Sequence, residues 1–220
     1  MRDTKRIIVL LSGNGSTLQA LLDQQSQYSY EVVGVISNKP DAHGLNRARS
    51  HRIAAIPLDH KIFSSREAFD RRLLEETKRF EPDLIVMAGY MRILSPEFVD
   101  YYADRLINIH PSLLPDYKGL HTYRRVLEDN QPQHGTTVHF VTSELDSGAH
   151  IIRASLDIQT VDNENSLRRR VQNMERQIYP RAVDLITSGR IRLEENKVWF
   201  DNQPLDPKGY QVKENSLEIP

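Results

Sequence analysis

Cysteine is absent from all 220 residues of the chain. The protein therefore cannot form a disulfide, a thiolate nucleophile or a cysteine-based zinc site. A chain without cysteine fits a reducing compartment, and we expect a cytoplasmic protein.

Long apolar runs and an excess of one charge are lacking as well. The first apolar run, residues 7–11, ends at a Ser-Gly turn and is too short for the core of a signal peptide or for a membrane span. Lys and Arg number 29 against 30 Asp and Glu, a net charge of -1, so no global positive field is available to hold a polyanion. We therefore expect neither a membrane nor a nucleic acid as partner.

Metal-ligand spacing is also missing from the eight histidines. His134 and His139 are expected to serve local structure, and His121 is a candidate for contact with a substrate. We expect no metal ion.

Apolar runs alternate with helical patterns over the first half of the chain. Strands are predicted at residues 7–11, 32–36, 53–58, 84–88 and 106–110, and helices at about 16–23, 42–51, 65–80 and 96–104, with Ser16 or Thr17 capping the first helix. This alternation predicts a doubly wound, Rossmann-like α/β fold with a mostly parallel sheet covered on both faces.

The second half has a different pattern. A helix is predicted at about 119–130, an antiparallel pair of strands at 136–141 and 151–158 joined by the loop 142–148, a helix at 164–188 interrupted near Pro180, a hairpin at 191–200 and a surface tail at 201–220. The whole chain is expected to form one domain.

A glycine turn, Gly13-Asn14-Gly15, joins the first predicted strand to the first helix. Backbone N–H groups at such a place can face an anion. There is no Gly-Lys-Ser/Thr, and Leu18 stands where the dinucleotide fingerprint requires its third glycine, so two better-known motifs are excluded. A monophosphate site and a tight turn that binds nothing both remain open.

Asn108 and His110 lie two residues apart in a predicted strand. Because side chains alternate along a strand, both point to one side, about 6.6 Å apart along the chain. An amide and an imidazole can together stabilise an oxyanion while the imidazole moves a proton, and Pro111 and Pro115 would stiffen the chain beyond them. Asp146 could orient His110 and keep it charged. The alternatives are an Asn-His pair bonded only within the structure, and an aspartate that serves its own turn.

Five segments together resemble the phosphoribosylglycinamide formyltransferases, folate-dependent enzymes of purine synthesis. They are IIVLLSGNGSTLQALLD, ISNKPDAHGLNRA, MAGYMRILSPEF, NIHPSLLPDYKGLHTY and HGTTVHFVTSELDSGAHI. The similarity covers most of residues 6–152 and continues more weakly to about residue 179. NIHPSLLP is highly specific for enzymes that use formyltetrahydrofolate.

The resemblance implies transfer of a formyl group from 10-formyltetrahydrofolate to the amine of glycinamide ribonucleotide without a metal. It implies one formyltransferase domain over residues 1–220, with a nucleotide-binding half at about 6–110, a folate and catalytic-loop half at about 111–200 and a tail at 201–220. The implied catalytic residues are Asn108, His110 and Asp146. The implied ribonucleotide-binding residues are Gly15, Ser16, Thr17 and Glu175, and the folate-binding residues are Arg66, Met91, Arg92, Ile93, Leu94, Asn108, Ser143 and Glu144.

Some of these assignments have simpler alternatives. Thr17 departs from the usual Asn, although the backbone N–H survives the change. Glu175 and Arg66, taken alone, would be solvated helix charges. The loop 142–148 is expected to become ordered when folate binds, and the protein to be a monomer or weak homodimer.

Relatives with the same Asn-His-Asp core formylate methionyl-tRNA or hydrolyse formyltetrahydrofolate. They carry an extra carboxyl-terminal or amino-terminal domain, for which we expect no room here, and the balanced charge disfavours tRNA. A non-catalytic folate or nucleotide sensor would not need His110 with a carboxylate partner.

Overall fold

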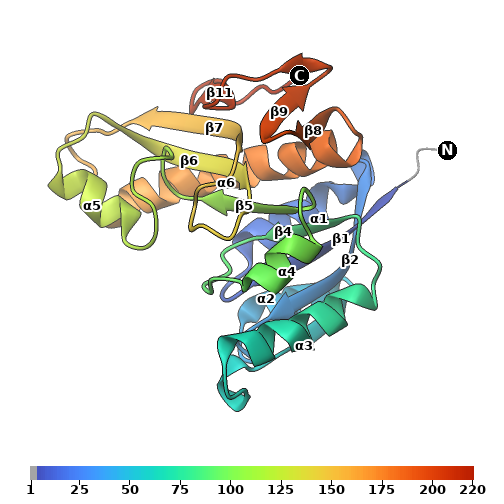
Figure 1. Ribbon diagram of the computed structural model, residues 1–220. Coiled ribbons are helices and arrows are strands. Elements are labelled where there is room, and N and C mark those ends of the chain that lie inside the picture. The colour runs from blue at the N-terminus through green and yellow to red at the C-terminus, as the bar shows by residue number, and fades with distance from the viewer. Residues whose placement is uncertain (1–3) are drawn as a thin grey trace. The chain divides into compact units, whose positions relative to one another are not determined.

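The computed structural model describes residues 4–220 and contains two compact units, one ending at Asn108 and one spanning Ile109–Pro220 (Figure 1). Strand β5 (Leu106–His110) crosses the division. Each unit has its own layers of strand and helix.

The first unit is built on parallel strands in the order β3-β2-β1-β4-β5. Their bounds are β1 Lys5–Leu11, β2 Tyr30–Ser37, β3 Ala54–Pro57 and β4 Leu84–Met87. Every side chain from Ile7 to Leu11 is fully buried. Because both faces of this strand are covered, its sequence is a continuous apolar run and does not alternate. The predicted α/β fold with a mostly parallel sheet is confirmed.

Helices connect the strands of this unit and lie on its two faces. Their bounds are α1 Ser16–Gln24, α2 His43–Ser50, α3 Arg66–Lys78 and α4 Pro96–Tyr101, with short 3₁₀ turns η1 Gln25–Gln27 and η2 His60–Ile62. The chain moves outward from β1 through β2 to β3, then returns to β4 and moves outward the other way. With right-handed crossovers, α1 and α2 cover one face and α3 and α4 the other.

Helix starts follow the predicted caps in α3 and α4. Ser65 Oγ accepts a hydrogen bond from Ala68 N at 3.0 Å, and Ser95 caps α4 with Pro96 in the first turn. Helix α4 ends at Tyr101, earlier than predicted, because its C-cap, Tyr102, leaves the helical conformation with φ of -103° and ψ of 26°.

The second unit combines an antiparallel pair with a long helix. Its elements are α5 Thr122–Glu128, β6 Gln133–Phe140, β7 His150–Asp157 and α6 Glu164–Thr187. Strands β6 and β7 are antiparallel, as predicted, and α6 packs against both of them (Figure 1).

The predicted interruption of α6 near Pro180 is wrong, because the helix runs through the proline without a break. Proline lacks an N–H and costs about 3 kcal/mol inside a helix. The helix also buries an apolar stripe, and each fully buried large apolar side chain contributes about 1.5–3 kcal/mol. The stripe includes Leu167, Val171, Met174, Ile178, Tyr179, Ala182, Val183 and Leu185. Packing along the stripe outweighs the local cost.

The tail at residues 201–220 forms more structure than its polar sequence suggested. Strand β11 (Tyr210–Lys213) pairs in parallel with β7, so the tail extends the sheet of this unit. The predicted hairpin is present as β8 (Ile191–Glu194) and β9 (Lys197–Phe200), joined by the short strand β10 (Gln203–Pro204) in a separate antiparallel sheet. Backbone pairing between strands does not require an apolar sequence, so the polar sequence of β10 and β11 did not predict them.

Within residues 4–220, no helix is both long enough and apolar enough to cross a membrane.

Helix α2 packs tightly against the end of β1 at Gly44. A Cβ at Gly44 would lie 2.5 Å from the Cδ2 atom of the fully buried Leu11, whereas a Cβ at Gly13 would meet no atom within 4 Å. We expect Gly44→Ala to lower the free energy of unfolding by about 1–3 kcal/mol, because overpacking forces neighbouring atoms to move. Urea unfolding measures this change, with Gly13→Ala as the control; equal effects of the two substitutions would contradict it.

Candidate active site

The turn after β1 leads into α1 through Gly15, which is the N-cap and has φ of 75°. No side chain caps α1, so the expectation that Ser16 or Thr17 caps it is wrong; Ser16 is already helical. A left-handed N-cap suits glycine, which lacks the Cβ that would strain this conformation. Since no side-chain cap bonds the first-turn N–H groups, they can serve an anion.

Helix α2 holds this turn from the side. Gly44 N–H donates to the Gly13 carbonyl at 3.1 Å. The Arg47 guanidinium donates to the carbonyl of Asn14 at 2.9 Å and to its Oδ1 at 2.8 Å. These bonds fix the turn without using the backbone N–H groups of residues 15–17.

Ser12 ties the turn after β1 to the segment after β4. Its N–H donates to the Gly89 carbonyl at 3.0 Å, and its Oγ accepts from Met91 N at 2.8 Å. Ser12 Oγ in turn donates to Asn38 Oδ1 at 2.5 Å. Strands β1 and β4 are neighbours from which the chain leaves in opposite directions. Ligands of open α/β sheets bind beyond the carboxyl ends of such strands.

The segment after β4 presents apolar side chains to solvent. Met91 is 64% exposed and Ile93 is 50% exposed, while Leu94 is buried. The Arg92 guanidinium lies 4.8 Å from the centre of the Phe69 ring. Arg66 is an exposed residue at the start of α3, and its Nε donates to Glu67 Oε1 at 3.3 Å.

Asp70 of α3 holds the end of the segment after β4. It is almost fully buried, and its Oδ2 accepts from Ser95 N at 2.5 Å. Burial raises the pKa of this carboxyl, while Ser95 and the nearby Arg92 act in the opposite direction. A buried carboxylate therefore fixes the end of the exposed segment and the start of α4.

Asn108 and His110 lie in β5, two residues apart, as the sequence predicted. Asn108 is half-buried and His110 is 7% exposed. In the second unit the His110 carbonyl accepts from Thr136 Oγ1 at 2.9 Å, which anchors the end of β5 beside β6.

Both nitrogens of the His110 ring face oxygen acceptors. Nε2 lies 3.0 Å from the Tyr117 carbonyl oxygen, and Nδ1 lies 3.5 Å from Asp146 Oδ2. Neither acceptor carries a hydrogen when the carboxyl group is ionised. The doubly protonated imidazolium therefore satisfies both contacts, and in the neutral ring the proton belongs on Nε2.

Asp146 is held in place by backbone geometry. Its Oδ2 accepts from Gly119 N at 2.9 Å, and its own φ of 47° is left-handed, which is uncommon for a residue other than glycine. Gly148 follows two residues later, where a Cβ would lie 1.8 Å from the Phe140 carbonyl oxygen. The loop can therefore pass this close to β6 only with glycine at that position.

A second buried histidine, His139, lies on the other side of Asp146. Its Nδ1 lies 2.8 Å from the Phe140 carbonyl, and its Nε2 lies 3.8 Å from Asp146 Oδ1. Burial lowers the pKa of His139 to about 4, so this ring is neutral near pH 7. His139 therefore carries no positive charge that could pair with Asp146, and His110 is the other histidine in contact with this carboxylate.

Ser143 and Glu144 are exposed residues of the loop before Asp146, and His121 is exposed at the N-cap of α5 with φ of 58°. None of these three side chains is brought to His110 by a hydrogen bond or ion pair within residues 109–220.

Glu175 is buried within α6, against the expectation that it could be a solvated charge. Its Oε1 lies 3.3 Å from Thr136 Oγ1. Burial raises the pKa of Glu175 to about 7. The same threonine hydroxyl bonds to the His110 carbonyl, so Glu175 and the end of β5 share a neighbour.

The groups that sequence analysis missed are mainly backbone atoms: the Tyr117 carbonyl at His110 and the Gly119 N–H at Asp146. Every residue carries such atoms, so no residue type marks them. Gly119 offers only an indirect signal, as a glycine shortly after the NIHPSLLP segment.

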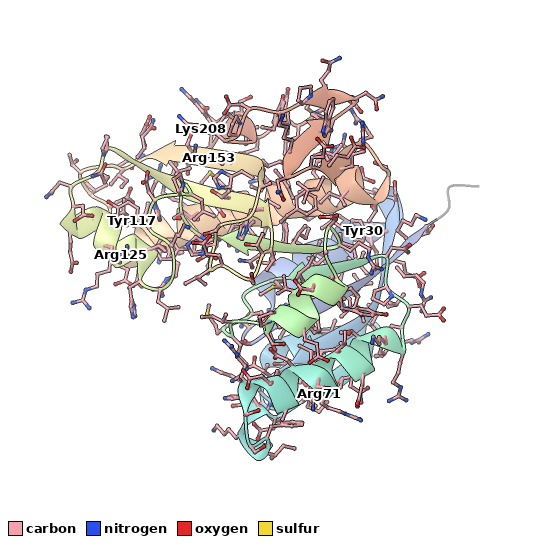
Figure 2. All side chains as sticks on the ribbon, viewed as in Figure 1. Tyr30, Arg71, Tyr117, Arg125, Arg153 and Lys208 are labelled. Atoms are coloured by element: carbon pink, nitrogen blue, oxygen red, sulfur yellow. The ribbon has the colours of Figure 1, made fainter. Side chains whose placement is uncertain are left out.

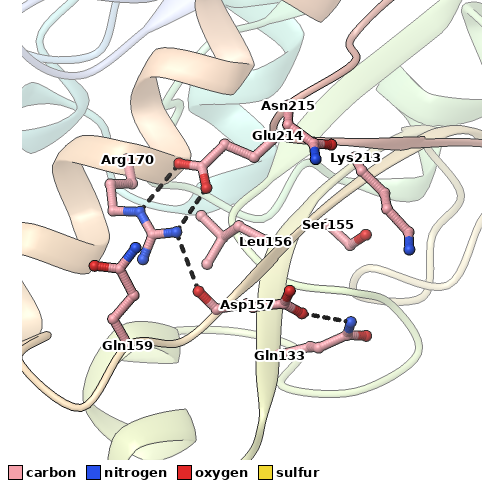
Figure 3. Close-up of a pocket in the computed structure, with 9 residues that line it drawn as sticks. All are labelled: Gln133, Ser155, Leu156, Asp157, Gln159, Arg170, Lys213, Glu214 and Asn215. Atoms are coloured by element: carbon pink, nitrogen blue, oxygen red, sulfur yellow. Dashed lines mark hydrogen bonds and ion pairs between the residues drawn. The ribbon is translucent and has the colours of Figure 1, made fainter.

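No group of three or more His, Cys, Asp or Glu residues in the described chain could hold a metal ion. A pocket of about 240 Å³ lies elsewhere in the second unit, beside Arg170, Glu214 and Asp157 (Figure 3). There Arg170 is neutralised by Glu214 at 2.6 Å and Asp162 at 2.5 Å, and none of the predicted site residues lines the pocket.

Comparison with known proteins finds one matching family model, described as formyl transferase, over residues 5–183. The phosphoribosylglycinamide formyltransferase of Escherichia coli is 50% identical over 210 residues, covering 94% of this chain and 99% of that protein. The trifunctional purine biosynthetic protein adenosine-3 of Drosophila melanogaster is 44% identical over 189 residues, covering 84% of this chain and 14% of that protein. Among solved structures, a phosphoribosylglycinamide formyltransferase from Coxiella burnetii in complex with CHES is 41% identical, with a TM-score of 0.92, covering 95% of this chain and 99% of that one.

The raised pKa of Glu175 predicts a pH-dependent loss of stability. Between the ordinary value of 4.5 and about 7, the unfolded chain ionises this carboxyl while the folded protein keeps it protonated. Stability is therefore greatest below the lower value and falls as pH rises through about 7, by up to about 3 kcal/mol from this group.

Glu175→Gln removes this titration. We expect the difference in free energy of unfolding between the original protein and Glu175→Gln to fall by about 3 kcal/mol from about pH 4.5 to about pH 8, as measured by urea unfolding. Glu31→Gln, at an exposed position in β2, is the control and should leave the pH dependence unchanged. A pH-independent difference for Glu175→Gln would contradict the burial of an ionisable carboxyl.

Proposed function

The chain belongs to the formyl transferase family, and from this membership we propose that it transfers the formyl group of 10-formyltetrahydrofolate to the amine of glycinamide ribonucleotide. The products are formylglycinamide ribonucleotide and tetrahydrofolate, a step of de novo purine biosynthesis. The observation that carries the proposal is His110, buried in β5 between the Tyr117 carbonyl and the Asp146 carboxylate. The names of the relatives support the choice of substrates.

The reaction begins when the amine nitrogen attacks the formyl carbon. A carbon–nitrogen bond forms and the carbonyl electron pair moves to oxygen, giving a tetrahedral oxyanion. We assign its stabilisation to the Asn108 amide and the His110 imidazolium, and one such donor is worth about a hundredfold in rate. The bond from that carbon to the folate nitrogen then breaks, and the departing nitrogen takes a proton.

Proton movement is assigned to Nδ1 of His110. Nε2 is engaged at 3.0 Å by a carbonyl oxygen, which fixes the ring and keeps a proton on that nitrogen. Nδ1 lies farther from its acceptor, 3.5 Å from Asp146 Oδ2, and we assign the exchange of a proton with the reacting groups to this nitrogen. The net movement of the proton is from the attacking amine to the departing folate nitrogen.

Asp146 stabilises the charged ring without touching the bond that breaks. Its Oδ2 accepts a hydrogen bond from the Gly119 N–H, and the neutral His139 carries no positive charge to pair with it. We assign to Asp146 the role of orienting the His110 ring and stabilising the imidazolium that supports the oxyanion.

The binding assignments extend to both substrates. For the ribonucleotide, we assign the phosphate to the backbone N–H groups of Gly15, Ser16 and Thr17, supported by the uncapped start of α1, and the ribose hydroxyls to Glu175. For the folate, the exposed apolar side chains of Met91 and Ile93 offer a contact surface for an aromatic ring system. The other folate assignments are Arg66, Arg92, Leu94, Asn108, Ser143 and Glu144.

The formyl donor acts as a co-substrate, and we propose that no metal takes part. The protein is expected to act as a monomer or weak homodimer.

The activity is tested by mixing the protein with glycinamide ribonucleotide and 10-formyltetrahydrofolate and following folate release. We expect turnover that requires the ribonucleotide and survives addition of a chelator. Folate release at the same rate without the ribonucleotide would indicate a hydrolase, and no release at all would indicate a protein that only binds its ligands.

The catalytic roles are tested by His110→Asn and Asp146→Asn. We expect each to lower kcat by about a hundredfold or more while KM changes little, because the lost interactions form mainly in the transition state. His51→Asn, at an exposed histidine after α2, is the matched control and should keep normal kinetics. A near-normal kcat for His110→Asn would show that the assigned mechanism is wrong.

A further inference from the structure

A register shift in the second unit brings two basic side chains to one face of its sheet. Val138 pairs with Ile152, but the next residue, His139, pairs with His150, so Ile151 is an extra residue in β7. In a regular strand, residues 150 and 153 would point to opposite faces. The bulge places His150 and Arg153 on the same face.

Lys118 joins this pair from the segment after β5. The positive charges of Arg153 and Lys118 both act on His150 and, after burial, lower its pKa. Lys118 Nζ donates to the hydroxyl of Ser147, a neutral partner. Two positive charges are thus close enough to His150 to oppose its protonation.

Within the described residues, neither His150 nor Arg153 makes a side-chain hydrogen bond or an ion pair. The buried atoms His150 Nδ1 and Arg153 Nε have no partner. Asp116 and Asp206 favour the charged form of Arg153, but neither forms an ion pair with it. Burial is the larger influence and lowers the pKa of Arg153. Arg170 and Arg190, by contrast, each bond directly to a carboxylate.

The tail borders this cluster. A Cβ at Gly209 would lie 2.8 Å from the Ile151 carbonyl oxygen and 2.9 Å from that of His150, so the backbone before β11 packs directly against the bulge. Figure 2 labels Arg153 on β7 and Lys208 in the segment that leads into β11. Lys208 is exposed and adds a further positive charge to this region.

We propose that Lys118, His150 and Arg153 form a binding site for a small dianionic oxyanion of the phosphate or phosphate-monoester class. A planar guanidinium offers paired donors to such a group, while lysine and protonated histidine supply point charges. The site differs from the turn at residues 13–17 in its elements and in its use of side chains. It does not depend on the formyl-transfer proposal.

The cluster adjoins the groups that hold the candidate catalytic pair. Lys118 lies between Tyr117, whose carbonyl contacts His110, and Gly119, whose N–H contacts Asp146. Through Ser147 it also contacts the loop that carries Asp146. An anion at Lys118 would therefore act on the two segments that position His110 and Asp146.

The test is a titration of the full chain with inorganic phosphate, followed by NMR of the histidine side chains near pH 7.5, where most of the phosphate is dianionic. His150→Gln assigns the signal of His150 among those of the eight histidines. We expect a saturable shift of that signal and a rise in the pKa of His150 when phosphate is bound. A His150 signal that phosphate leaves unmoved overturns the site.

Matched variants separate this site from general charge effects. Arg153→Gln is expected to weaken the response of His150 about tenfold or more, because it removes hydrogen bonds to a charged group. Arg124→Gln, which removes the same charge from an exposed arginine of α5, should leave the response unchanged. Equal effects of the two would overturn the site and indicate an adventitious ion only.

Two further measurements complete the test. Lys118→Gln is expected to weaken the same response, and it decides the result if Arg153→Gln fails to fold. Acetate, a monoanion, is expected to bind with an affinity about tenfold lower than that of phosphate, or lower still. Equal binding of acetate would overturn the assignment to a dianion.

Discussion

The His110 imidazole lies between two oxygen acceptors, and the segments around it are arranged to maintain this contact. A buried histidine ordinarily loses its charge, as His139 does, because burial disfavours the ionised ring. At His110 the two ring nitrogens instead lie 3.0 Å from a carbonyl oxygen and 3.5 Å from a carboxylate oxygen. Both acceptors lie in loops whose backbones are left-handed at Tyr117 and Asp146. This conformation is unfavourable for residues other than glycine, and the packing around the loops stabilises it.

Asp146 lies between two histidines, His110 and His139, which differ in their surroundings. If His139 were also charged, the charge of Asp146 would be divided between the two rings. The Phe140 carbonyl places the proton of neutral His139 on Nδ1, away from Asp146. His139 therefore fills space beside the carboxylate without neutralising it, while the Gly119 N–H donates a hydrogen bond to Asp146 Oδ2. The burial of His139 and its hydrogen bond to the Phe140 carbonyl thus leave His110 as the electrostatic partner of Asp146.

Local patterns predicted much of this molecule, and the failures share a cause. The continuous apolar run at residues 7–11 predicted a buried strand, and alternation along the strand placed Asn108 and His110 on one side of β5. The continuous helix through Pro180, the strand formed by the tail and the extra residue at Ile151 all depend on partners distant in sequence. The Tyr117 carbonyl and the Gly119 N–H belong to the same class, because a backbone atom becomes distinctive only when the fold brings a side chain to it.

The net charge of the chain says nothing about the local grouping of its charges. A net charge of -1 rules out a global positive field, but it sets no limit on how charges are grouped. Arg170, Arg181, Arg190 and Arg192 in the second unit each form an ion pair with a carboxylate, and their charges cancel locally. Arg153 does not, because a single extra residue in β7 turns it toward His150 and Lys118, and the nearest acidic residues remain too far away to pair with it. A nearly neutral chain can thus carry a concentrated cationic site next to the loops that hold its catalytic pair, and that site arises from strand register, which composition does not record.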